Sequence, residues 1–147
     1  MKNLIQIAIS IAILLISFLI IINIPFEEKV STKLNDNILL IYSKGIGIGG
    51  IVSLAMLNNG VIVNYDVHLN KTINQLSSEE LNQLRSAINN NQFEVSKISL
   101  LNKWKGRLPG CFDCDMSVHI YINKNGETIK VGKSDIIWNI VSKLKLF

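Results

Sequence analysis

An uncharged apolar run near the start of the chain constrains the fold most. Between Leu4 and Ile24 the sequence reads LIQIAISIAILLISFLIIINI and contains no charged residue. A helix that crosses a bilayer needs about 20 predominantly apolar residues, whereas a buried helix of a soluble domain usually keeps a polar stripe. The polar residues here are few and uncharged: Gln6, Ser10, Ser17 and Asn23. We therefore expect residues 1–24 to form a transmembrane anchor that contacts the membrane through residues 4–24.

A cleaved signal peptide is the alternative to an anchor. Signal peptides have a shorter apolar region of about 7–15 residues and small residues at the cleavage site, but PFEEKV follows Ile24. An uncleaved signal-anchor is the favoured interpretation, and cleavage stays open. Lys2 precedes the run, and Glu27, Glu28 and Lys29 follow it. Because positive charge favours the cytoplasmic side, we expect a single-pass cell-membrane protein with its N-terminus inside and its C-terminal domain outside the cytoplasm.

The remaining sequence has the length and patterning of one small domain. Residues 25–36 are polar and begin with Pro, which is typical of a linker, and residues 37–147 suit a single core. Apolar runs on either side of Asn58-Asn59-Gly60 indicate antiparallel strands. Residues 118–123 alternate apolar and polar side chains, which is typical of a half-buried strand, and a turn through Asn125-Gly126 leads to another strand.

Two amphipathic segments predict helices. SSEELNQLRSAINNN begins with Ser77 and has Glu80 three residues later, the spacing of a capping box. SDIIWNIVSKLKLF begins with Ser134 as a plausible N-cap and has a broad apolar face. Strands and helices in this order predict an α+β fold, in which a transmembrane helix precedes a small antiparallel sheet packed with two helices. The segment from Lys103 to Asp113 is expected to be a loop.

The glycines Gly45, Gly47, Gly49 and Gly50 match the dinucleotide-binding spacing G-x-G-x-x-G. That fingerprint requires a helix whose N-terminus holds the pyrophosphate. Here only about ten residues separate Gly50 from the next strand, and these residues end in the hairpin signal Asn58-Asn59-Gly60. They leave no room for the helix that the fingerprint requires. We interpret the glycines as a flexible hairpin or bulged turn and expect no cofactor.

The two cysteines of the chain, Cys111 and Cys114, have three interpretations. Outside the cytoplasm paired cysteines tend to oxidise, which favours a local disulfide. A redox C-x-x-C usually places its first thiol at a helix N-terminus, but a strand pattern and acidic neighbours surround this pair. A structural zinc site needs four N or S ligands, and the chain adds only two histidines. We expect a disulfide and no metal, with redox chemistry and metal binding as open alternatives.

One short stretch, NKWKGRLPG, offers an aromatic and basic surface through Trp104, Lys105 and Arg107. The formal net charge is only +4 and no second basic stripe supports nucleic-acid binding, so we expect no nucleic-acid partner. No spacing joins a nucleophile to a base, and we expect no catalytic residues. Aromatic and arginine side chains are enriched at binding hot spots. This stretch and the Gly45–Gly50 loop are therefore the candidate binding surface.

Several segments resemble one known family when taken together: YSKGIGIGG, LAMLNNG, LSSEELNQLRSAINNNQF, and CFDCDMSVHIYINKNGETIKV before a terminal helix. Over about residues 38–146 this pattern resembles the emfourin-like family. The resemblance implies a small α+β fold and, from the family's named member, inhibition of thermolysin-like metallopeptidases. The membrane anchor and the glycine run depart from the family pattern, and no inhibitory residue carries over.

These features together predict a membrane-anchored, non-catalytic domain that binds another protein outside the cytoplasm. The expected partner is a peptidase or another envelope protein. Two alternatives remain, a thiol-disulfide redox protein that uses Cys111 and Cys114, and a structural component of the envelope.

Overall fold

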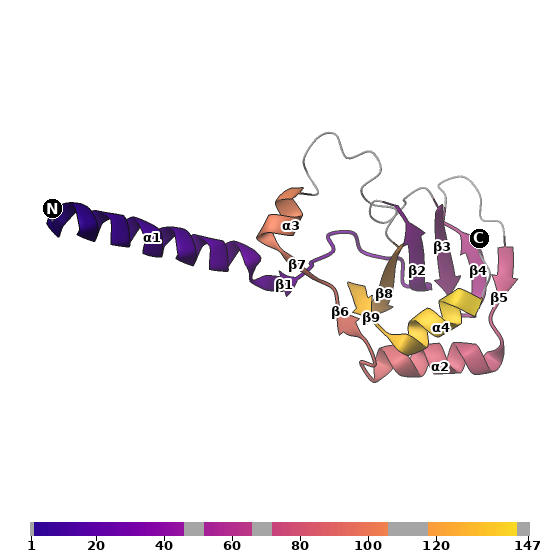
Figure 1. Cartoon of the computed structure of the whole chain (residues 1–147). Helices are drawn as coiled ribbons and strands as arrows, with labels where there is room; N and C mark the ends of the chain where they lie inside the picture. The colour runs from indigo at the N-terminus through magenta and orange to yellow at the C-terminus, as the bar shows by residue number, and fades with distance from the viewer. Residues whose placement is uncertain (1, 46–51, 66–71, 106–117, 144–147) are drawn as a thin grey trace. The chain divides into compact units, whose positions relative to one another are not determined.

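The computed structural model describes residues 2–45, 52–65, 72–105 and 118–143. The helices of these residues are α1 (Lys2–Asn23), α2 (Ser78–Asn89), α3 (Leu100–Lys105) and α4 (Asp135–Lys143). The strands are β1 (Pro25–Glu27), β2 (Ile38–Lys44), β3 (Val52–Leu57), β4 (Val61–Asn64), β5 (Thr72–Gln75), β6 (Glu94–Val95), β7 (Lys97–Ser99), β8 (Val118–Lys124) and β9 (Glu127–Lys133). The predicted α+β class is confirmed (Figure 1).

The chain divides into two compact units. Unit 1 comprises residues 1–27 and 97–111, and unit 2 comprises residues 28–96 and 112–147. In unit 1, β1 pairs antiparallel with β7, with Pro25 opposite Ser99 and Glu27 opposite Lys97. The helices α1 and α3 contact each other, and Ile22 is buried.

The helix α3 lies where a loop was expected. Leu100 to Lys105 are helical, and the hydroxyl of Ser99 accepts a hydrogen bond from the Asn102 N–H (3.3 Å) just before the helix. Ser99 therefore acts as an N-terminal cap. The prediction of a loop from Lys103 is wrong as far as Lys105, because the signal is a single serine before a six-residue helix.

Unit 2 is built on one antiparallel sheet of seven strands in the order β5-β4-β3-β2-β8-β9-β6. The predicted hairpin at Asn58-Asn59-Gly60 joins β3 to β4. The predicted turn between β8 and β9 has φ of 54° at Asn125 and 80° at Gly126. Positive φ at both central residues is the geometry of a type I′ hairpin turn, which Asn-Gly favours because both residues tolerate it.

The capping box that begins α2 is confirmed. The hydroxyl of Ser77 accepts from the N–H of Glu80 (3.2 Å), and Oε2 of Glu80 accepts from the N–H of Ser77 (3.0 Å). After α2 the chain turns through Asn91 at φ 54°, and Phe93 packs against the core. At the start of α4 the hydroxyl of Ser134 donates to the carbonyl of Gln92 (2.8 Å) and accepts from the N–H of Ile137 (3.4 Å).

Both helices of unit 2 that flank the sheet contribute to its main hydrophobic core. Figure 1 shows α2 and α4 together against one face of the sheet. From the helices Leu84, Ala87, Ile88, Ile137, Ile140 and Val141 are buried. From the strands they meet Leu40, Tyr42, Leu54, Met56, Ile62, Ile120, Ile122 and Val131. Burial raises the pKa of Tyr42.

The other face of the central strands is buried as well. Ile41, Ala55 and Tyr121 form a second cluster with Leu34, which is 2% exposed. The expectation of a half-buried strand at residues 118–123 is therefore wrong at Tyr121, which is 4% exposed. The reason is that the segment before β2 brings Leu34 to this face, a contact that alternation within one strand does not reveal.

This second face also contains a buried polar pair. The hydroxyls of Ser43 and Ser53, on the paired strands β2 and β3, lie 3.0 Å apart. Both residues are buried. Buried polar groups need such partners, because an unpaired one loses its hydrogen bonds to water without replacement.

Residues 28–34, which the sequence suggests to be linker, make specific contacts within unit 2. The Glu28 carboxylate lies 2.8 Å from the Lys130 ammonium and accepts from the hydroxyl of Ser96 (3.3 Å). The Glu28 N–H donates to the Ser96 carbonyl (2.9 Å). Here β9 and the chain after β6 approach so closely that a Cβ at Gly132 would lie 3.1 Å from Cα of Ser96. The segment is thus attached to the β9 side of the sheet.

Candidate functional site

The glycine run enters the described part of the chain only at its first member. Gly45 follows β2, is buried and has a φ of 111°. Gly47, Gly49 and Gly50 lie outside the described residues. The hairpin or bulged turn that we expect there therefore stays a prediction.

The aromatic and basic stretch begins in α3. Trp104 and Lys105 end this helix, but their side chains and the whole of Arg107 lie outside what the structure describes. Just before them, the ammonium of Lys103 is 5.8 Å from the centroid of the Phe26 ring, within the range of a cation–π contact. This stretch belongs to unit 1 and the first glycine of the run to unit 2, so the two predicted surfaces are on different units.

The cysteines and one of the histidines also fall outside the description. Cys111, Cys114 and His68 are among the residues left out, so the local disulfide stays a prediction. His119 lies on β8, and its ring centroid is 6.3 Å from that of Tyr121. Among the described residues, no group of three or more His, Cys, Asp or Glu side chains is placed to hold a metal ion.

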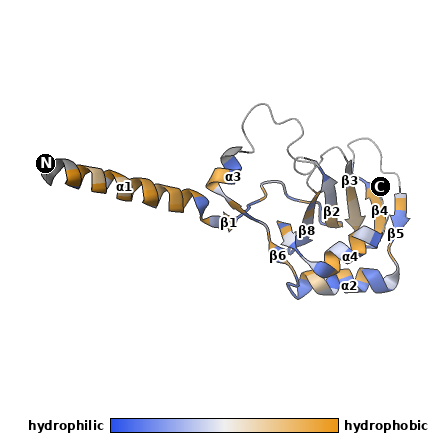
Figure 2. Cartoon of the chain, viewed as in Figure 1, coloured by the Kyte–Doolittle hydropathy of each residue, from blue (hydrophilic) through white to orange (hydrophobic). Residues whose placement is uncertain are grey.

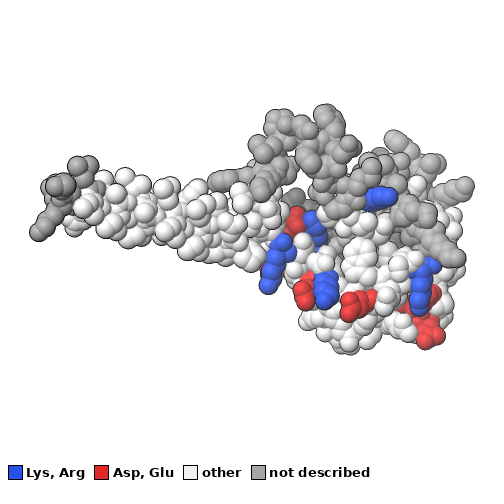
Figure 3. Space-filling view, viewed as in Figure 1, with Lys and Arg blue, Asp and Glu red and all other residues white. Residues whose placement is uncertain are grey.

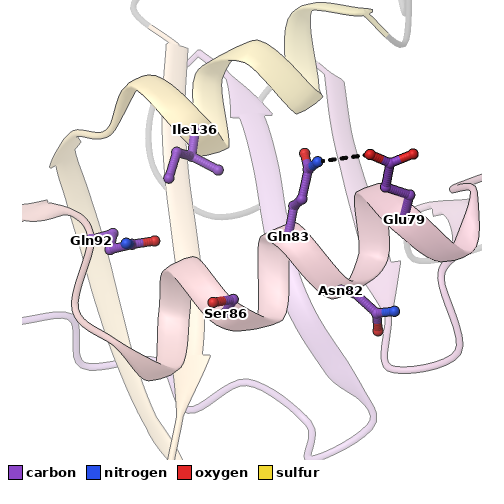
Figure 4. Close-up of a pocket in the computed structure, with 6 residues that line it drawn as sticks. All are labelled: Glu79, Asn82, Gln83, Ser86, Gln92 and Ile136. Carbon is purple, nitrogen blue, oxygen red and sulfur yellow. Dashed lines mark hydrogen bonds between the residues drawn. The ribbon is translucent and has the colours of Figure 1, made fainter.

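A groove lies beside α2 and α4 in unit 2. It has a volume of about 690 Å³. Figure 4 shows the lining residues on α2, on the turn after it and on α4, with Glu79 and Gln83 pointing toward α4 and Asn82 pointing away from it. They are Glu79, Asn82, Gln83, Ser86, Gln92 and Ile136. The Gln83 amide donates to the Glu79 carboxylate (3.3 Å) across one turn of α2.

The chemistry of this α2/α4 groove suits recognition. The side-chain amides of Asn82, Gln83 and Gln92 each offer donors and an acceptor, which is the hydrogen-bonding pattern of a peptide group. Ile136, half-buried, supplies the one large apolar contact of the lining. Among the described residues, the lining contains one hydroxyl, on Ser86, and no cysteine, histidine or lysine. The described part of the groove therefore offers hydrogen-bond donors and acceptors beside one apolar side chain.

Sequence reasoning missed the groove, although a signal was present. Glu79, Gln83 and Ser86 recur at helical spacing beside the apolar stripe of α2. In an antiparallel α+β domain with two helices, both helices commonly cover the same face. Their facing flanks then border a groove, and the polar residues on the α2 flank are its lining.

Electrostatics at the start of α2 are set by the cap. The hydrogen bond from the Ser77 side chain, followed by the one from the Ser77 backbone, lowers the pKa of Glu80. On the face in Figure 3, Lys and Arg side chains of the described residues lie among Asp and Glu side chains. Neither sign of charge dominates the described part of that face.

The second candidate surface is α1 itself. Its span Ile5–Asn23 is long and apolar enough to cross a membrane, and Figure 2 shows hydrophobic colour along most of the helix. Twelve large apolar side chains from Ile5 to Ile21 are 52–70% exposed. The prediction that this run forms a helix long enough to span a membrane is thus confirmed for the described residues.

No protein-family model matches this chain, and no curated protein or solved structure matches it at a significant level.

Proposed function

We propose that this chain is a single-pass membrane protein whose unit 2 is a non-catalytic protein-binding domain outside the cytoplasm. The observation that carries the membrane assignment is the exposure of α1. Monomeric soluble proteins rarely expose apolar patches larger than a few hundred Å², whereas α1 exposes large apolar side chains along most of its length. A bilayer is the solvent in which such a helix is stable.

Orientation follows from the charges that flank the helix. Lys2 lies before the span, and Glu27 and Glu28 lie after it. The positive-inside tendency then puts the N-terminus in the cytoplasm. To test this, Asn89→Cys on the exposed end of α2 is introduced with Cys111→Ser and Cys114→Ser. A membrane-impermeant thiol reagent should label this cysteine in intact cells, and labelling only after lysis would reverse the orientation.

Protein binding is supported by the α2/α4 groove. Its amide-rich lining can pair with the backbone of an extended peptide, and Ile136 can receive one apolar side chain. The resemblance to the emfourin-like family suggests a thermolysin-like peptidase as the partner. On this proposal the chain holds a secreted peptidase, or another envelope protein, at the membrane surface.

The partner is tested with the full chain in detergent micelles against a panel of thermolysin-like peptidases. Inhibition at micromolar concentration supports the peptidase, and its absence removes that partner. Asn82→Ala in the groove is compared with Asn89→Ala, which changes the same side chain on the same helix outside the groove. Trp104→Ala tests the surface predicted from sequence. If only Trp104→Ala weakens inhibition, the function stands and the groove is not the contact surface.

The proposed location of the C-terminal domain outside the cytoplasm also predicts the oxidation state of the two cysteines. Outside the cytoplasm Cys111 and Cys114 should form a local disulfide. Alkylation of the denatured protein without reductant should then leave both unlabelled, and labelling of both would contradict the disulfide. Replacing both with Ser should cost less than the ~3 kcal/mol of a 15-residue loop, because the closed loop is much shorter.

A further inference from the structure

The polar residues of α1 are not scattered around the helix. At 100° per residue, Gln6, Ser10 and Ser17 lie within about 40° of one another around the axis. Of the four polar residues in Ile5–Asn23, these three share a face. The fourth, Asn23, lies at the end of the span, and its amide donates to the carbonyl of Leu19 (2.8 Å).

The spacing on this face is that of a coiled-coil seam. Gln6, Ser10, Ile13, Ser17 and Ile20 follow one another at intervals of four, three, four and three residues, the pattern of a and d positions. We call these five residues the polar seam. All of them are exposed in α1. Ile22 is buried and points away from the seam by more than 90°, so the contact of α1 with α3 leaves the seam open.

In a bilayer these side chains need polar partners. Ser10 and Ser17 lie within about 6 Å of the midpoint of the span, where water is absent. The hydroxyl of Ser10 donates to the carbonyl of Gln6 (3.0 Å) and keeps its acceptor positions free. A carboxamide at Gln6 has two donors and an acceptor that lipid tails cannot satisfy. Polar side chains of this kind hydrogen-bond across helix–helix interfaces, and small residues such as serine let the helices approach.

We propose that the polar seam is a self-association surface, at which α1 pairs in parallel with α1 of a second copy of this chain. The proposal rests on the membrane insertion proposed above. Copies inserted by the same rule share one orientation, so each seam residue meets its own counterpart across a two-fold axis. A carboxamide can donate to and accept from another carboxamide, and a hydroxyl likewise, so the seam is complementary to itself. The four-three spacing gives the left-handed crossing common in membrane bundles.

The opposite face of α1 supplies a rival and therefore a matched control. Ala8 and Ala12 are small residues four apart on that face, a spacing that also permits close helix approach. Single cysteines are placed at Ser10, Ser17, Ala8 or Ala12 in the full chain with Cys111→Ser and Cys114→Ser. The variants are reconstituted in phosphatidylcholine vesicles and oxidised with copper phenanthroline. Disulfide-linked dimers are expected from Ser10→Cys and Ser17→Cys only.

The other outcomes are decisive. Dimers from Ala8→Cys or Ala12→Cys, or equal yields from all four, would overturn the seam. Each variant is also extracted with alkaline carbonate. A chain that stays in the membrane but forms no dimer overturns the seam and leaves the anchor intact, whereas a chain that is extracted overturns both.

A second measurement avoids substituting the serines. Chains labelled at Asn89→Cys with donor and acceptor dyes are diluted with lipid, and energy transfer gives the association constant. Gln6→Leu should lower this constant about fivefold, as expected for the loss of one interhelical hydrogen bond. Asn23→Leu, which removes a polar side chain off the seam, should leave it unchanged. Equal effects of the two substitutions, or none from Gln6→Leu, would contradict the proposal.

Discussion

The helices α1 and α4 are both rich in isoleucine, but the isoleucine side chains are mostly exposed in α1 and mostly buried in α4. In α4, Ile137 and Ile140 are 0% and 2% exposed, whereas Ile9 in α1 is 55% exposed. The difference is in the pattern. The polar residues of α4 leave one apolar stripe that packs on the sheet, while the apolar residues of α1 surround the helix. Apolar content therefore does not decide where a helix is stable; its distribution around the axis does.

The largest expected effect concerns α4, the helix that packs on the sheet. Ile137→Ala should lower the free energy of unfolding of unit 2 by about 2–5 kcal/mol, because it leaves a cavity in a filled core. Ile9→Ala should leave that free energy unchanged, because Ile9 belongs to unit 1 and its side chain is 55% exposed. Urea unfolding of the full chain in micelles, followed by tryptophan fluorescence, measures both. Equal losses would break the distinction between the two helices.

The next effect tests the lipid side. Leu15→Lys places a charge near the middle of α1, at a cost to insertion of about 2.5–3.5 kcal/mol. The fraction of protein that resists alkaline carbonate should fall. Asn139→Lys, at an exposed position of α4, should change neither membrane retention nor the stability of unit 2 by more than about 0.5 kcal/mol. Full retention of the Leu15→Lys chain would argue that α1 is not the anchor.

A smaller effect concerns helix ends. In water α2 begins with a capping box, and Ser77→Ala should cost about 0.5–2 kcal/mol, because the N–H of Glu80 loses its acceptor. The matched control is Ser78→Ala, one residue further and exposed. The same unfolding assay applies, and a cost at Ser78 as large as at Ser77 would contradict the role of the cap.

The smallest effect is a pH dependence of the same cap. The pKa of Glu80 is lowered in the folded state, chiefly by the Ser77 hydrogen bonds. The ionised carboxylate therefore adds stability above its unfolded pKa of about 4.3, and this is lost as the pH falls through the folded pKa. The stability difference between wild type and Glu80→Gln should be present at neutral pH and shrink in acid. A difference that grew in acid would reverse the sign.

Signals local to the chain predicted much of the fold. The turn at Asn125-Gly126, the capping box and the N-cap at Ser134 are each fixed by residues within a few positions of one another, and all three are found. The short strands β1, β5, β6 and β7 were missed, because two to four residues carry no period of their own. In addition, β1 pairs with β7 and β6 with β9, which are far away in the sequence. The burial of Tyr121 escaped prediction for the same reason, since Leu34 covers it from far away in sequence.

The candidate site was less predictable than the fold. The groove between α2 and α4 cannot be read from any single segment of the sequence, because the residues that line it come from three parts of unit 2. Glycines, tryptophans and cysteines stand out in a sequence, whereas Asn82 and Gln83 look like ordinary solvent-exposed residues. Only the positions of the helices on the sheet distinguish them.

The close approach at Gly132 has an evolutionary consequence. A Cβ there would lie 3.1–3.3 Å from backbone atoms of Ser96 and Val95 rather than from a flexible side chain, so the backbone would have to shift by a few tenths of an ångström and a rotamer change would not help. Descendants of this chain that keep β6 against β9 should keep glycine at this position while most surface residues drift.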